Sequence, residues 1–136
     1  MARQIRLDDR EWIEIVNSNG DVTGGFYWNP SDLDIVKRCE KVIDFFDHLE
    51  VPEGGSDTDT LFALSDSIKQ QFDYLISSGS SNALFKHANP LTPREDGTLF
   101  AEYVLSQLVA FIESELNVRM KKTTDRIEKY TKDYQK

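Results

Sequence analysis

The chain has 136 residues, in which 24 acidic side chains outnumber 16 basic ones and give a formal net charge of −8. This length predicts a single domain around one hydrophobic core. The single cysteine excludes an internal disulfide, and no stretch approaches the roughly 18 apolar residues of a membrane-spanning helix, so we expect a cytoplasmic protein with no membrane partner.

The charge is distributed unevenly along the chain. Residues 119–136 hold seven bases and three acids, a local charge of +4, so the first 118 residues carry −12. Because an acidic body repels phosphate backbones, we expect no nucleic-acid partner, although the basic C-terminal segment alone could contact RNA or an acidic protein. We expect one globular domain over residues 1–118 and a basic helical extension over residues 119–136. The alternative for the extension is a solvated helix end, whose bases suit the negative pole of the helix dipole.

The N-terminal part of the domain has the pattern of a β-hairpin. Two β-rich runs within residues 12–28 flank Asn19-Gly20, a pair that tolerates the positive φ of a hairpin turn. Gly24 and Gly25 predict a bulge or bend in the second strand. The run 4–7 is too short to be assigned as a third strand.

Four helical segments follow the hairpin. Apolar residues at spacings of three and four predict helices over residues 31–49, 58–78, 81–87 and 98–118. Ser31 and Ser81 are the expected N-caps of the first and third helices. The sequence thus predicts a mainly α (α+β) fold, in which an N-terminal β-hairpin precedes a bundle of three to four helices with a long C-terminal helix.

The last helix continues into the basic extension without glycine or proline. From Thr98 to Tyr134 it would span ~55 Å, against ~35 to 40 Å for the diameter of a body of this size. Its apolar stripe narrows to a thin seam that suits a contact between two helices, formed by Met120, Ile127, Tyr130 and Tyr134. We expect these four residues to bind protein, by self-association or by docking on a helical client, with fraying as the alternative.

Residues that could carry chemistry are few. His48 and His87 have no partner at metal-ligand spacing, and Cys39 lies on the apolar stripe of the first predicted helix. The acids Asp57 and Asp59 lack the further ligands of a calcium loop and suit a helix N-terminus instead. We therefore expect no catalytic, metal or cofactor-binding residues and a protein that is not an enzyme.

Aromatic side chains are concentrated on the predicted hairpin. A two-stranded ribbon has only one face to bury, so part of this aromatic area must rest on the helices or on a partner. On the first helix, Phe45 and Phe46 are adjacent, about 100° apart, and one of them leaves the core-facing stripe. We expect Trp12, Trp28 and Phe45 to bind protein; the alternative is that all of these rings lie in the core.

Two stretches resemble a known family. Residues 26–34 (FYWNPSDLD) and 36–40 (VKRCE) are similar to the strand, Asn-Pro turn and first helix of the small tail assembly chaperones of long-tailed (siphovirus-type) phages and prophages of Gram-positive bacteria. Residues 67–75 (SIKQQFDYL), with NALF at 82–85, resemble the amphipathic helix and short segment ending in Phe that follow in those proteins. The similarity covers roughly residues 12–118.

The resemblance implies a binding function without catalysis. Such chaperones are thought to coat the long, helical tape measure protein and to keep it soluble while the tail tube assembles around it. The resemblance thus implies that the tape measure protein is the partner and that the protein acts in the cytoplasm of the bacterial host. The alternative is a structural minor tail protein or head-tail connector of the virion.

Overall fold

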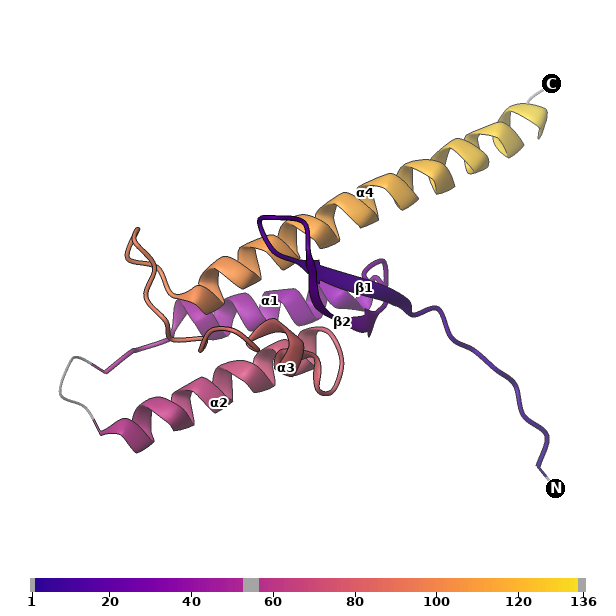
Figure 1. Cartoon of the computed structure of the whole chain (residues 1–136). Coiled ribbons are helices and arrows are strands. Elements are labelled where there is room, and N and C mark those ends of the chain that lie inside the picture. The colour runs from indigo at the N-terminus through magenta and orange to yellow at the C-terminus, as the bar shows by residue number, and fades with distance from the viewer. Residues whose placement is uncertain (1, 53–56, 135–136) are drawn as a thin grey trace.

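The computed structural model describes residues 2–52 and 57–134, with side chains up to Arg119 (Figure 1). Its elements, in chain order, are β1 (Glu11–Val16), β2 (Val22–Trp28), α1 (Asp34–Asp47), α2 (Thr58–Leu75), α3 (Ser80–Leu84) and α4 (Phe100–Tyr134). The predicted fold class is confirmed: an antiparallel hairpin precedes a mainly helical body, and the last helix is long. Figure 1 shows α1 between α2 and α4, with the hairpin against one end of the helices.

The hairpin pairs Glu11 with Trp28 and closes through a turn in which Gly20 takes a φ of +84°. The predicted irregularity in the second strand is present but lies one residue earlier than the two glycines. Pairing shifts at Thr23, which has no partner in the ladder, and its hydroxyl donates to the Ile15 carbonyl at 3.3 Å. The run 4–7 forms no strand, and the segment leads away from the body (Figure 1).

The N-terminus of α1 differs from its prediction. Ser31 does not cap the helix, because its hydroxyl instead donates to the Asn29 side-chain oxygen at 3.1 Å. The carboxylate of Asp32 accepts the backbone N–H of Asp34 at 3.0 Å. A carboxylate there also suits the positive end of the helix dipole. The helix therefore begins at Asp34, three residues after the predicted start.

The cap of α3 also differs from its prediction. Ser81 lies inside this short helix, and its backbone N–H donates to the Asp73 carboxylate of α2 at 2.8 Å. Gly79, at the turn between the two helices, has a φ of +83° that favours glycine. A side chain of α2 thus satisfies the first turn of α3, a contact between segments that local sequence rules do not capture.

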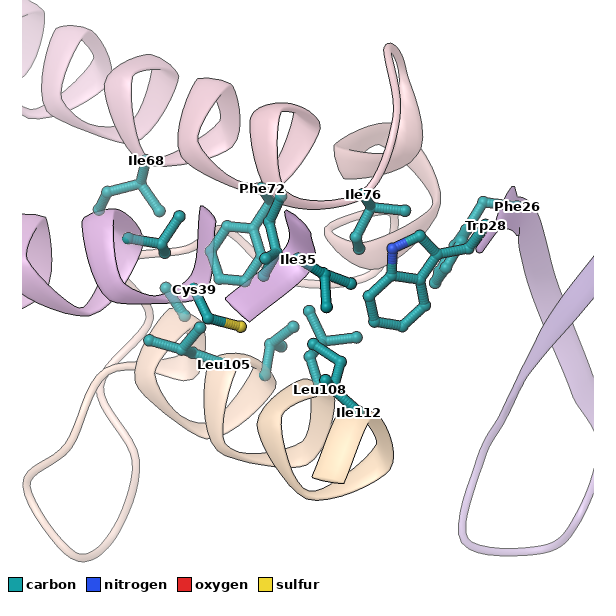
Figure 2. Packing of buried hydrophobic residues seen from close by; sticks show 14 of the residues in the cluster. Phe26, Trp28, Ile35, Cys39, Ile68, Phe72, Ile76, Leu105, Leu108 and Ile112 are labelled. Atoms are coloured by element: carbon teal, nitrogen blue, oxygen red, sulfur yellow. The ribbon is translucent and has the colours of Figure 1, made fainter. Parts of the chain in front are cut away.

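The core lies between α1, α2 and α4 and continues to the inner face of the hairpin (Figure 2). Phe72 of α2 is fully buried, and its ring meets those of Phe46 and Phe85 edge to face, at 6.0 and 5.1 Å. Phe85 in turn meets Phe100 at the start of α4, at 6.0 Å. These rings connect all three long helices. The buried stripe of α1 starts at Ile35, whereas Leu33, the apolar residue just before the helix, is exposed.

Two contacts hold α4 to the hairpin. The buried indole of Trp28 stacks on Phe111, with ring centroids 5.9 Å apart. Arg119 donates from one guanidinium nitrogen to Ser31 Oγ and from the other to Glu11 Oε1, each at 2.7 Å. Arg119, predicted to begin the extension, therefore anchors α4 to the body. Beyond it the helix runs past the rest of the molecule (Figure 1).

Replacing Phe72 by alanine is expected to lower the free energy of unfolding by about 3 to 5 kcal/mol, because the lost ring leaves a cavity in the core. Urea denaturation followed by circular dichroism measures this loss. The control is Phe62→Ala on the same helix, where the ring is 57% exposed and the change should stay within about 0.5 kcal/mol. Equal losses in the two variants would contradict the central position of Phe72.

Candidate protein-binding surfaces

Trp28 is not part of an exposed binding surface. Its side chain is only 1% exposed, and its ring contacts Phe26 within the hairpin and Phe111 on α4. The expectation that Trp28 binds a partner protein is therefore corrected. Alternation along β2 places Phe26 and Trp28 on the inner face of the hairpin, and the helices supply the surface that covers them.

The outer face of the hairpin carries an exposed aromatic pair. The rings of Trp12 and Tyr27 meet edge to face at 5.1 Å and are 53% and 54% exposed. The guanidinium of Arg10 lies over the Tyr27 ring, 5.5 Å from its centroid. The Trp12 indole also lies across Gly25 of the neighbouring strand. Trp12 is thus accessible, as expected, although half of its surface is already covered by its own hairpin.

Phe45 lies in a surface groove between α1 and α2. The groove, here called the α1–α2 groove, consists of two adjoining hollows of about 460 and 510 Å³ that share Asp44 and Phe45. Its apolar lining is formed by Phe45, Leu49, Leu64 and Tyr74. Phe45 and Phe46 are both half-buried at the edge of the core, and Phe45 lines this groove.

Polar groups surround the α1–α2 groove. Lys41 and Gln71 line one hollow, and His48 and Ser67 line the other. His48 Nδ1 lies 2.9 Å from the Asp44 carbonyl oxygen, and this hydrogen bond, together with the negative charge of Asp44, raises the pKa of His48. The groove therefore offers an apolar floor with both charge signs at its rim.

A second groove, the α1–α4 groove, has a volume of about 410 Å³ and lies on the other side of α1. Its apolar lining comprises Ile43 and Phe46 of α1 and Leu105, Val109 and Ala110 of α4. Three acids also line it: Asp47, Glu102 and Glu113. Among the described residues that line this groove, none is basic, so its rim is negatively charged.

The expected binding residues do not form one site. Phe45 contacts the neighbouring Phe46, with centroids 5.6 Å apart, whereas Trp12 contacts Tyr27 on the hairpin. The seam of the extension lies outside the described side chains: Met120, Ile127, Tyr130 and Tyr134.

Side chains able to carry chemistry are dispersed. Within residues 2–52 and 57–119, no group of three or more His, Cys, Asp or Glu side chains is placed to hold a metal ion. Cys39 is buried in the core, and this burial raises the pKa of its thiol. No helix in the described part of the chain is both long and apolar enough to cross a membrane.

Sequence reasoning missed most of the residues that line the grooves, among them Ile43, Leu64, Tyr74 and Val109. Part of the signal was present, because Ile43 follows the buried Val42 and Tyr74 precedes the buried Leu75. Apolar residues beside a buried stripe widen it beyond what one neighbouring helix covers. Which of them face a groove depends on how far apart the helices lie.

Gly25→Ala is expected to lower the free energy of unfolding by about 1 to 3 kcal/mol. The added Cβ would lie 2.5 Å from Trp12 Cζ2 and 2.7 Å from the Ile13 carbonyl oxygen, so both the indole and the backbone of β1 have to shift. Gly24→Ala is the matched control, since its Cβ would make only an ordinary contact, 3.8 Å from Ala83 Cβ. If urea denaturation finds both variants equally stable, neither the indole nor the backbone of β1 lies this close to Gly25.

Comparison of the chain with protein-family models, with curated proteins and with solved structures finds no match.

Proposed function

We propose that the protein is a tail assembly chaperone of a long-tailed phage or prophage, acting by binding rather than by catalysis in the cytoplasm of the bacterial host. Its client is the tape measure protein, which it keeps soluble while the tail tube assembles. The resemblance of residues 26–40 and 67–85 to that family supports the proposal. The strand, Asn-Pro turn and helix that carry the resemblance are consecutive in the fold as β2, the turn at Asn29-Pro30 and α1.

The observation that carries the proposal is the α1–α2 groove. Two helices that lie side by side form a trough into which a third helix can lay an apolar stripe at i, i+3, i+4 and i+7 spacing. Phe45 and Tyr74 offer aromatic rings there, and Leu64 extends the apolar floor. A long helical client exposes stripes of this kind along its length, so several copies of the protein can bind one client.

The polar rim suits a holding function that must be reversible. Exposed apolar area invites aggregation, and a ring of polar side chains limits the continuous patch. Binding of the chaperone covers the exposed apolar surface of an unassembled client and keeps that client soluble. The fraction of client that is covered rises with the chaperone concentration and with the affinity of the complex. Assembly of the tail tube then removes the client from the groove by competing for the same helical surface.

The test is co-expression with overlapping helical fragments of the tape measure protein of the same phage or prophage. We expect the wild-type chain to keep at least one fragment soluble and to co-purify with it. Tyr74→Asp should lower the recovered fragment about tenfold or more, because it puts a charge into the apolar groove. The Tyr74 side chain is 45% exposed, so this change leaves the core intact.

The matched control is Phe62→Asp, which also charges an exposed ring of α2 but lies outside the α1–α2 groove. It should retain the fragment. Equal losses in the two variants, or failure of every fragment to become soluble, would contradict the proposal. Stoichiometric amounts of the protein in purified particles would also contradict it and would favour the structural role in the virion.

A further inference from the structure

The α1–α4 groove has the features of a docking site for a positively charged amphipathic helix. Ile43 and Val109 give it an apolar floor, and Asp47, Glu102 and Glu113 contribute only negative charge. A helix that buries an apolar stripe on this floor and carries bases beside the stripe is complementary to it in both respects.

The chain itself contains a helix of this description. Residues 120–136 hold six bases and three acids, a charge of +3. The backbone of α4 is helical to Tyr134, and no other element of the described chain lies beside this part of it (Figure 1). A helix that projects alone and carries apolar residues gains little support from its own molecule.

The spacing of apolar residues continues from the groove into the projecting part. Val109 of the groove is followed along α4 by Leu116, Met120, Ile127 and Tyr134, at intervals of seven, four, seven and seven residues. Such intervals place residues on one stripe of a helix. The stripe that lines the α1–α4 groove in the body is therefore the same stripe that forms the seam of the extension.

We propose that the projecting part of α4 from one copy of the protein docks in the α1–α4 groove of a second copy, and that the exchange is reciprocal. The occupant cannot come from the same molecule, because α4 is one continuous helix and contains no glycine or proline at which to fold back. This proposal does not depend on the tail chaperone function, which uses the opposite side of α1.

The lengths agree with a closed dimer. Along α4 the groove extends from Glu102 to Glu113, roughly 16 Å, and residues 120–134 provide roughly 21 Å of helix. Asn117 lies midway along α4 between the centre of the groove and the centre of the projecting part. If two α4 helices run antiparallel about a two-fold axis near Asn117, each groove therefore faces the projecting part of the partner. Both grooves are then occupied, and association stops at two copies.

The test is analytical ultracentrifugation of the full chain over about 1 to 100 µM, a range in which a weak dimer becomes populated. We expect the mass to rise with concentration toward twice the 15.6 kDa monomer. Val109→Glu in the groove and Ile127→Lys in the projecting part should each raise the dissociation constant about tenfold or more. An equimolar mixture of the two variants should restore the dimer. In a mixed pair, the glutamate in the groove of one copy faces the lysine of its partner's projecting helix. The second groove and the helix that docks in it both keep the wild-type residues.

The control is Gln107→Glu, an exposed position of α4 outside the groove, which should dimerise as the wild type does. Circular dichroism checks that each variant is folded, and Ile127→Lys lies beyond the body, so it leaves the core unaltered. A wild-type chain that stays monomeric throughout this range overturns the proposal. So does a mixture of variants that remains monomeric, or a dimer that neither substitution weakens.

Discussion

The ring of Phe72, on α2, contacts two other rings. One is Phe46 on α1, and the other is Phe85, which directly follows α3. Because Phe85 also contacts Phe100 at the start of α4, this chain of edge-to-face rings determines the positions of three helices at once. Figure 1 shows α1 between α2 and α4, and side chains of α1 and α4 together line the α1–α4 groove. The flanks of α1 then carry apolar side chains that neither neighbour covers fully.

Both candidate surfaces follow from that position of α1. On the flank toward α2, Phe45 and Tyr74 line a groove with a mixed polar rim, which suits reversible binding of a helical client. On the flank toward α4, Ile43 and Val109 line a groove whose rim is acidic, which suits the basic extension of a second copy. The two proposed partners, a helical client and a second copy, would therefore use opposite sides of α1.

Local sequence patterns predicted the strands and helices. Contacts between these elements determined the helix caps, which side chains are buried and where the grooves lie. The hairpin, the apolar stripes and the long last helix follow from periodicity and turn residues, which act over a few positions. Ser31 does not cap α1, because Asn29 and Arg119 bind the serine hydroxyl; Leu33 occupies the N-cap position, without a side-chain hydrogen bond. Trp28 moved from the expected surface into the core because Phe111, far along the chain, stacks on it. The grooves were not predictable, since their width depends on how the large side chains between the helices pack.

The central claim is that the two sides of α1 bind different partners. Hydroxyl-radical footprinting with mass spectrometry tests it most directly, because it reports the accessibility of individual side chains in the full-length protein. The account predicts that a higher protein concentration alone protects Ile43 and Val109, and that a tape measure fragment protects Phe45 and Tyr74. Protection of all four residues by the fragment alone, or of none under either condition, would contradict the account.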